Sequence, residues 1–388
     1  MRVLFVSEMV YGSPQGGTTL ALSHLRLLKS LYGASSVDTC YINLEQVYDY
    51  ANGEANEVIE ATHAKLQRLS NVLSNRMYFL SKGAEDRIAS IVIDGAYEVV
   101  WFDNAMCGGA AARIRDKCPT TAIVTFYQFN AVQRYFQIYL EKPSRLRLMY
   151  NCFGSIPQEL QHLKASDVNY VLTSRDKQLF SSINNVHDCK LLPMMVEDIL
   201  SDDLDKDTII KSSDNMKVTL LFVGSTYWPN IEGVKWFVSN VIPRLGNKCV
   251  LEIVGRGLEV LRNDFASIDY VDVVGSCDNL AEKYCSADLV VAPILHGDGM
   301  KTKVAEALMY GRRVLGTTEA LVGYEESTCI LCDTPDDYVY EISRCIDCGD
   351  LGFRGDARAD YENRYSLDAL RLHVSSDIEQ AIISRKDK

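Results

Sequence analysis

The sequence contains no long apolar run: none approaches the roughly 18 residues that a membrane-spanning helix needs. The apolar stretch at the N-terminus, Met1–Val6, is too short for a signal peptide and is predicted to form the first strand. Twelve cysteines in the absence of a signal peptide indicate reduced thiols, as in a cytoplasm. We therefore expect a cytoplasmic protein without a membrane span.

An excess of positive charge is also missing. Lys and Arg number 40 against 52 Asp and Glu, and the resulting net charge of −12 argues against nucleic acid as the main partner. Apolar residues make up 47% of the chain, as in ordinary globular proteins. The 388 residues suffice for two domains of about 150–200 residues, each with its own core.

One stretch has the pattern of a ligand-binding unit. The apolar run Ala287–Ile294 is predicted to be a buried parallel strand, and the turn His296–Gly299 follows it. An amphipathic helix comes next, with Val304 and Leu308 on one face, and then a strand at Arg313–Gly316. Strand, glycine turn, helix and strand in this order can direct backbone N–H groups and the positive end of a helix at an anion.

The residues at the start of this helix suggest what the anion is. Gly299 and Met300 are predicted to offer backbone N–H donors to a phosphate or a sugar hydroxyl. Lys301 and Lys303 add positive charge at the helix N-terminus, which is the unfavourable end for the helix dipole. This placement indicates an anionic ligand.

Two acidic residues complete the stretch. Glu306, one turn into the helix, is predicted to accept hydrogen bonds from a ribose diol, and Asp298 in the turn from sugar hydroxyls. The alternative is a solvated helix on which Lys303 and Glu306 form an i, i+3 ion pair.

A second stretch carries motifs that indicate a class of enzyme. Met216–Gly224 is a predicted strand that ends in FVG, and Ser225–Phe237 continues it with the residues S…PN…G-x-x-W-F. With G-x-G-x-K-x-K-x-x-E at 297–306, these motifs agree in order and spacing over residues 216–326. In this region the chain resembles the C-terminal half of family-4 glycosyltransferases. The resemblance implies the α/β GT-B fold, in which two Rossmann-like doubly wound parallel-sheet domains face across a cleft.

The resemblance also implies an activity and a role for each of the two domains. The chain is expected to move a sugar from a nucleotide-sugar donor to a hydroxyl of a saccharide or lipid-linked saccharide, with retention and without a metal or cofactor. Many relatives act on bacterial surface polysaccharides or their precursors. Residues 1–208 would form the acceptor-side domain and 209–365 the donor domain, with a helix at about 366–386 packing back on the first domain. A polar, turn-rich linker near 205–215 marks the boundary.

Further donor-binding candidates share a position after a strand or before a helix. In relatives, the loop corresponding to 275–277 lines the nucleobase pocket, and the loop at 16–17 faces the donor diphosphate. A glycine in such a loop is weak support when it stands alone, since many connections carry glycines for packing. The candidates are Gly16, Gly17, Gly224, Ser225, Gly255, Arg256, Gly275 and Ser276.

The chain departs from the family pattern at several positions. Asn130 stands about where relatives carry a histidine near the transferred sugar. The usual pair of glutamates corresponds to Asp298 and Glu306, so the first acid is one methylene shorter. Ser225 and Asn230 stand roughly where relatives have an arginine and a lysine. The lysines at 301 and 303 are therefore predicted to carry the diphosphate instead.

Three other segments have competing interpretations. The basic and aromatic segment 132–148 is predicted to contact a lipid-linked acceptor or a membrane surface, or to be a solvated helix. Residues 44–92 are predicted to be mostly helical, with a stripe at Leu66, Leu69, Val72, Leu73 and Met77 that covers a sheet face. Two Cys-x-x-Cys pairs, at 329–332 and 345–348, have zinc-like spacing, but neither has a glycine-bearing turn, so no metal site is predicted.

Two other functions stay open. The substitutions at Asn130 and Ser225 are compatible with a catalytically weak GT-B subunit that acts as the partner of another transferase. Nucleotide-sugar 2-epimerases share the architecture but need acid–base groups, and only His296 of the six histidines lies at a motif.

Overall fold

The computed structural model describes residues 1–8, 16–44, 55–127, 145–184, 189–200, 217–297 and 299–387. The chain divides into two compact units. Unit 1 comprises Met1–Met195 and Leu370–Lys388, and unit 2 comprises Val196–Ala369. The linker predicted near 205–215 lies outside the described residues.

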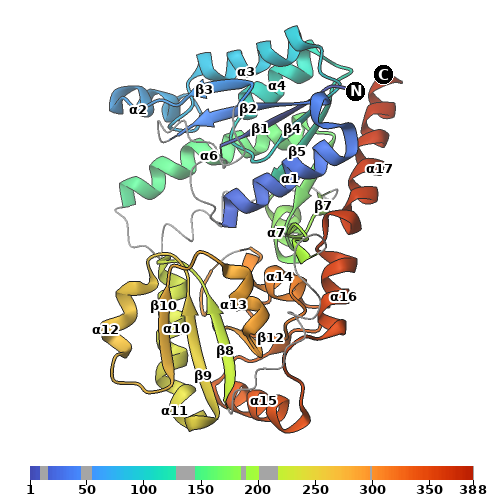
Figure 1. The fold of residues 1–388 in the computed structure, drawn as a ribbon. Helices are drawn as coiled ribbons and strands as arrows, with labels where there is room; N and C mark the ends of the chain where they lie inside the picture. The colour runs from blue at the N-terminus through green and yellow to red at the C-terminus, as the bar shows by residue number, and fades with distance from the viewer. Residues whose placement is uncertain are drawn as a thin grey trace. The chain divides into compact units, whose positions relative to one another are not determined.

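Unit 1 is built on a seven-stranded parallel sheet with the order β3-β2-β1-β4-β5-β6-β7 (Figure 1). The chain starts in the middle, runs outward to β3 and then crosses to the other side at β4, so the order reverses between β1 and β4. The strands are β1 Val3–Ser7, β2 Val37–Asn43, β3 Glu57–Glu60, β4 Val99–Phe102, β5 Ala122–Tyr127, β6 Val168–Val171 and β7 Cys189–Leu191.

Helices cover both faces of this sheet. Leu4 and Val6 of β1 pack in one core with Ile88 of α3 and Ile114 of α4. On the opposite face, His24 of α1 contacts the Trp101 ring of β4 at a centroid distance of 5.3 Å. Strands buried on both sides explain the continuous apolar runs in the sequence. The α-helices are α1 Gly16–Tyr32, α2 Lys65–Leu73, α3 Lys82–Gly95, α4 Gly108–Lys117, α6 Arg145–Ala165 and α7 Ser174–Asn184.

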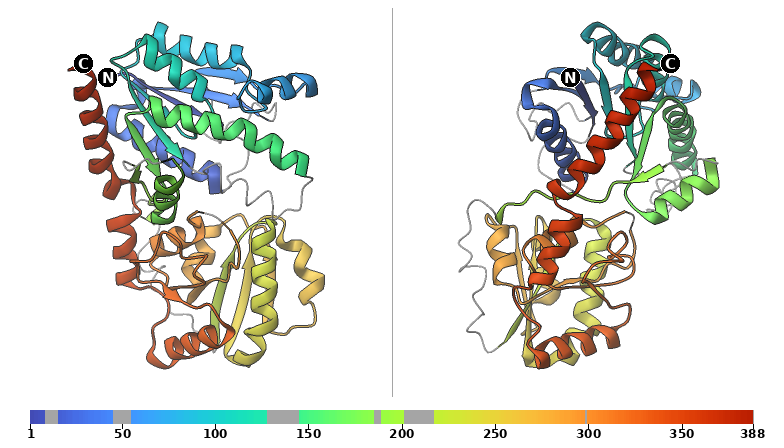
Figure 2. Two further views of the ribbon diagram at one scale, coloured as in Figure 1. Left: turned by 180° about the vertical axis from the view of Figure 1, so that it is seen from behind. Right: turned by 90° about the vertical axis from the view of Figure 1, so that its right-hand side faces the viewer.

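The last helix, α17 (Leu367–Lys386), belongs to unit 1 from Leu370 onward (Figure 2). Its contact with the sheet centres on Asp377, which accepts a hydrogen bond from the Tyr170 hydroxyl at 2.7 Å and pairs with Lys190 Nζ at 2.5 Å. A hydroxyl of β6 and an ammonium group of β7 therefore hold the C-terminal helix against the sheet of unit 1.

The segment 44–92 differs from its prediction. It contains the edge strand β3, and only part of its apolar stripe is buried. Val72 and Met77 are buried, but Leu66, Leu69 and Leu73 are exposed, so the prediction that these leucines cover a sheet face is wrong. The periodicity identified an apolar helix face correctly but not the direction in which the face points.

Unit 2 has a six-stranded parallel sheet with the order β10-β9-β8-β11-β12-β13, which reverses between β8 and β11. The strands are β8 Val218–Val223, β9 Cys249–Val254, β10 Val271–Gly275, β11 Leu289–Ala292, β12 Val314–Gly316 and β13 Ile330–Leu331. The α-helices are α10 Trp228–Asn240, α11 Ile242–Leu245, α12 Arg262–Phe265, α13 Leu280–Ser286, α14 Thr302–Met309, α15 Pro335–Cys348 and α16 Gly355–Arg364.

The two sheets confirm the predicted class of two doubly wound, Rossmann-like parallel-sheet domains. In such sheets ligands bind beyond the carboxyl ends of the strands where the order reverses. This rule points to the ends of β8 and β11 in unit 2. No helix in the described part of the chain is long and apolar enough to cross a membrane.

Candidate functional site

The end of β8 meets the following loops through closely packed backbone. Gly224 N donates to Val254 O at 3.0 Å, and Gly255 N donates to Gly275 O at 2.7 Å. A Cβ at Gly255 would lie 1.7 Å from Gly224 O, and the φ of Gly255 is 137°. Glycine is therefore required at 255, because both the positive φ and the close approach exclude a side chain. The glycines predicted from sequence serve here to bring three strand ends together.

Lys303 extends from α14 to the end of β8. Its Nζ donates to Asn230 Oδ1 at 2.8 Å, and it lies 4.5 Å from the centroid of the Phe222 ring. Asn230 Nδ2 in turn donates to the carbonyl oxygen of Ser225 at 3.2 Å. These two hydrogen bonds thus connect α14 through α10 to the loop that follows β8.

The environment of Lys303 disfavours the charged form of its ammonium group. The pKa of Lys303 is lowered to about 7: burial is the main cause, repulsion from Lys301 acts in the same direction, and attraction to Glu306 opposes both. Among the described residues no carboxylate lies within salt-bridge distance of its ammonium group. Its hydrogen-bond partner is a neutral amide, so the positive charge is available to an anion.

Glu306 lies one turn further along α14. The hydroxyl of the buried Tyr284, from α13, donates to Glu306 Oε2 at 2.8 Å, and the Tyr284 ring stacks on Tyr310 at 4.9 Å. Burial raises the pKa of Glu306, while the hydrogen bond from Tyr284 and the charge of Lys303 lower it. The carboxylate is therefore held in one orientation on the same helix as Lys303.

The residues just before α14 are more constrained than the sequence suggested. Lys301 Nζ donates to Gly299 O at 2.8 Å and lies 3.5 Å from Glu319 Oε1, so part of its charge is already compensated. Met300 is buried and packs against Gly323. Gly299 has a φ of 62°, which favours glycine at this turn.

A carboxylate of unit 2 already binds a backbone N–H group in the loop after β10. Glu259 Oε1 accepts a hydrogen bond from the backbone N–H of Ser276 at 2.6 Å, and this bond is the main reason that the pKa of Glu259 is lowered to about 2. The predicted donor group at Ser276 is thus occupied by a side chain of unit 2. Arg256, between Gly255 and Gly257, is exposed.

The remaining predicted residues lie in unit 1 or outside the described residues. Gly16 and Gly17 begin α1 in unit 1. Asn130 and Asp298 lie outside the described residues, as does most of the segment 132–148. The described residues contain no group of three or more His, Cys, Asp or Glu side chains that could hold a metal ion.

Sequence reasoning overlooked two sets of residues. Tyr284 was not among the predicted site residues, although its hydroxyl orients Glu306. In unit 1, the reversal point holds a buried cluster in which His24 Nδ1 lies 2.6 Å from Asp103 Oδ1, and the Ser7 hydroxyl donates to Asp103 Oδ2 at 3.4 Å. His24 lies among the leucines of α1, and no local motif marks it.

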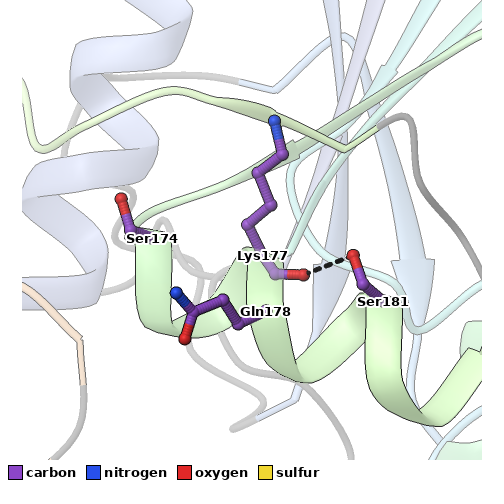
Figure 3. A pocket seen from close by; sticks show the side chains of 4 residues that line it. All are labelled: Ser174, Lys177, Gln178 and Ser181. Atoms are coloured by element: carbon purple, nitrogen blue, oxygen red, sulfur yellow. Dashed lines mark hydrogen bonds between the residues drawn. The ribbon is translucent and has the colours of Figure 1, made fainter.

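A surface hollow of about 500 Å³ lies elsewhere, on α7 of unit 1 (Figure 3). The described residues that line it come from this helix: Ser174, Lys177, Gln178 and Ser181. The Ser181 hydroxyl donates to the carbonyl oxygen of Lys177 at 3.0 Å. None of the described residues that line the hollow is a carboxylate or a predicted site residue, so we assign no ligand to it.

Residues 217–348 match the family model described as "Glycosyl transferases group 1". No curated protein matches the sequence significantly. Anabaena HepE, solved in complex with UDP and glucose, is similar to this chain in structure, with a TM-score of 0.67 and 12% identity over 98% of this chain and 99% of that chain. Sucrose-phosphate synthase from Thermosynechococcus elongatus is similar with a TM-score of 0.70 and 14% identity over 99% of each.

UDP-GlcNAc 2-epimerase from Neisseria meningitidis, solved with bound UDP-GlcNAc, is also similar, with a TM-score of 0.57 and 13% identity over 98% of this chain and 100% of that chain. The fold is that of GT-B glycosyltransferases, as predicted. Unit 2 carries the glycosyl transferases group 1 domain, which confirms the prediction of a glycosyltransferase-type enzyme at the level of that domain.

Proposed function

We propose that the chain is a retaining glycosyltransferase that moves a sugar from a nucleotide-sugar donor to a hydroxyl of a saccharide or lipid-linked saccharide acceptor, without a bound metal. The observation that carries this proposal is the placement of Lys303 and Glu306 on one helix at the reversal point of unit 2. The match of residues 217–348 to the group 1 domain supports the same conclusion.

Lys303 and Glu306 suit the diphosphate and the ribose of a nucleoside diphosphate, respectively. Side chains at i and i+3 on a helix have Cβ atoms about 5–6 Å apart. Lys303 would bind the diphosphate at the N-terminal end of α14, where the helix dipole also favours an anion. Glu306, oriented by Tyr284, would accept hydrogen bonds from the ribose diol. A cation followed one turn later by a carboxylate thus follows the order of diphosphate and ribose in the ligand.

In this proposal the lysines stabilise the leaving group. As the bond between the sugar and the diphosphate breaks, negative charge grows on the diphosphate, and fixed cations and helix dipoles lower the barrier because they require no reorganisation. Lys303 is the principal cation, and Lys301 contributes less because it is shared with Glu319. Asp298 would bind hydroxyls of the transferred sugar, and Asn130 would face that sugar from unit 1.

The acceptor hydroxyl would attack the sugar on the face from which the diphosphate departs, which gives retention. The other proposed donor contacts are the backbone of Gly299 and Met300 and the loops at Gly16–Gly17, Gly224–Ser225, Gly255–Arg256 and Gly275–Ser276. A donor that uses the Ser276 N–H has to displace Glu259 from it.

A catalytically weak partner subunit of another transferase is the second candidate. It is favoured by Asn130, which cannot serve as an acid–base group, and by the side chain that already occupies the Ser276 N–H. A 2-epimerase is the third candidate, on the likeness of fold to the Neisseria enzyme.

The test is thermal unfolding with UDP-, GDP-, ADP- and dTDP-sugars, on the wild type, Glu306→Ala and the control Glu282→Ala, which removes an exposed carboxylate from α13. A ligand at 100 times its dissociation constant should add about 2.7 kcal/mol of stability. We expect one nucleotide to stabilise the wild type and the control but not Glu306→Ala. If no nucleotide stabilises any of them, the partner-subunit function replaces the transferase. Product analysis with the stabilising donor separates transfer from epimerisation.

A further inference from the structure

Helix α2 (Lys65–Leu73) of unit 1 is apolar on the side that faces away from the protein. Leu66 is 84% exposed, Leu73 is 77% exposed and Leu69 is 48% exposed. We call these three residues the leucine stripe, because their spacing of three and four residues places them along one helix face. The buried residues of the helix are Asn71 and Val72. An amphipathic surface helix of a globular protein normally has the opposite arrangement.

Polar contacts fix this orientation. Asn71 Nδ2 donates to the Thr62 hydroxyl at 3.2 Å and to the carbonyl oxygen of Tyr78 at 3.1 Å. Arg68 Nε donates to the carbonyl oxygen of Thr62 at 2.7 Å, and its guanidinium lies 5.3 Å from the centroid of the Tyr78 ring. If the helix rotated to bury its leucines, it would lose these contacts and leave buried polar groups unpaired, which is costly. The hydrogen bonds of Asn71 and Arg68 therefore fix the outward direction of the leucine stripe.

The charge around the stripe is of one sign. Residues 61–84 contain Lys65, Arg68, Arg76 and Lys82 and no Asp or Glu, in a protein whose net charge is −12. The first acidic residue that follows, Glu85, is buried and pairs with Arg76 at 3.0 Å. Within residues 61–84 the exposed apolar face of α2 is thus accompanied by the exposed Lys65 and Lys82 and by no carboxylate, which suits a surface that is both apolar and anionic.

We propose that α2 binds unit 1 to the surface of a bilayer that contains anionic lipids. The leucine stripe enters the boundary between head groups and acyl chains, and Lys65 and Lys82 contact lipid phosphates. Binding of this kind depends on the buried apolar area together with attraction to anionic lipid. This surface differs from the segment 132–148 that the sequence suggested for membrane contact, and it does not depend on the proposed transferase activity.

A second copy of the chain fits this face less well. A nine-residue helix is about 13 Å long, so its exposed face is small beside the roughly 800 Å² per partner that a standard protein interface buries. In a twofold dimer the same patch meets itself, so the cations of residues 61–84 would face each other and repel. A bilayer has neither restriction.

The test measures co-sedimentation of the full chain with vesicles of phosphatidylcholine and phosphatidylglycerol at equal ratio, and with vesicles of phosphatidylcholine alone. The variant Leu66→Gln/Leu73→Gln removes the two most exposed leucines of the stripe. Leu372→Gln is the matched control, because Leu372 is 81% exposed on α17 of the same unit. Lys65→Glu/Lys82→Glu tests the charges.

We expect the wild type and the control to bind the anionic vesicles, and high salt or the absence of anionic lipid to weaken binding. The leucine variant should bind at least tenfold more weakly, and so should the lysine variant. Circular dichroism should show both variants to be folded, as expected for changes at exposed positions. Equal binding by the leucine variant, no binding by the wild type, or lipid-free self-association that the leucine variant abolishes would each overturn the proposal. Because nucleotide binding is not part of the measurement, failure here is distinct from failure of the proposed function.

Discussion

Replacing Lys303 with methionine is expected to make the free protein more stable and to weaken nucleotide binding. Methionine keeps most of the length and volume of the side chain but removes the charge. In the wild type, burial and repulsion from Lys301 lower the pKa of Lys303 to about 7, so keeping this lysine charged at neutral pH costs folding free energy. A group that is costly in the free protein and useful to an anionic ligand has the character of a functional residue.

The size of the effect follows from the pKa. A drop from the ordinary 10.5 to about 7, at about 1.36 kcal/mol per pKa unit, gives an upper limit of about 4 kcal/mol at pH 7. The hydrogen bond from Lys303 to Asn230 Oδ1 is lost in the variant, and water at the half-buried site reduces the desolvation cost. We therefore expect a gain of about 1–2 kcal/mol in the free energy of unfolding.

The pH dependence distinguishes this cause from a packing effect. Between pH 7 and about 10 the unfolded chain keeps a proton on Lys303 that the folded chain has released, so the stability of the wild type rises with pH across this range. The variant has no such group, so its advantage is full below pH 7 and disappears as the pH approaches 10. Urea unfolding followed by tryptophan fluorescence is suitable, because Trp228 and Trp236 both lie in unit 2.

The control is Lys235→Met, which removes an exposed lysine of unit 2 that pairs with Asp264. It should show no such gap in stability between pH 7 and 10. A stability difference between Lys303→Met and the wild type that stays constant from pH 6 to 10 would refute the argument from desolvation. Calorimetry with the stabilising nucleotide should show wild-type affinity falling above pH 7, by up to tenfold per pH unit, because the bound diphosphate requires the protonated lysine. Unchanged affinity in Lys303→Met would remove this residue from the site.

Two further predictions test the geometry of unit 2. Tyr284→Phe removes the hydrogen bond to Glu306 and should lower nucleotide affinity about tenfold in calorimetry, since a bond to a charged group contributes about 1.5–3 kcal/mol; unchanged affinity would mean that Tyr284 does not position the carboxylate. Gly255→Ala should prevent stable folding of unit 2, because its Cβ would lie 1.7 Å from Gly224 O, whereas Gly349→Ala, in the left-handed helical conformation after α15 and with open space around it, should cost about 1 kcal/mol through its positive φ alone. Equal urea midpoints for the two glycine variants would contradict this.

The fold could be predicted from the sequence because its information is local. Buried parallel strands appear as short continuous apolar runs, such as Val3–Val6 and Leu289–Ala292. Each run is followed by a glycine-bearing or polar turn and then a helical pattern, which together define doubly wound α/β units. The short edge strand β3 was missed, since its sequence, EVIE, is half polar and has no such run.

The site could be predicted only in part. Lys303 and Glu306 were identified because their relation is a helical spacing, which the sequence shows directly. Their partners were not, because Asn230 is 73 residues from Lys303 and Tyr284 is 22 residues from Glu306. The contact of Lys303 with Asn230 depends on the pairing of β8 with β11, and that of Tyr284 with Glu306 joins the helices before and after β11. No local pattern encodes either contact.

The leucine stripe shows a different limit. A period of 3.6 residues reveals that one helix face is apolar, but burial of that face is an assumption about the remainder of the fold. Here the inner side of α2 carries Asn71 and Arg68, which form hydrogen bonds to Thr62 and Tyr78. The leucines therefore stay exposed to water. A short helix can be held by such contacts because burying two or three leucines would require it to give up several paired polar groups at once.

In our proposal, the contact between Lys303 and Asn230 also accounts for an anion site at a place where the sequence departs from the family pattern that it resembles. Asn230 stands roughly where relatives carry a cation, and its Oδ1 lies 2.8 Å from the ammonium group of Lys303. A second lysine at 230 would bring two positive charges into a half-buried space, where their repulsion amounts to several kcal/mol at an effective dielectric constant of about 20. An amide instead accepts a hydrogen bond and leaves the positive charge of Lys303 in place. In our proposal, the charge missing at 230 is thus supplied in space by α14, and the neutral side chain at 230 is what allows Lys303 to occupy the reversal point.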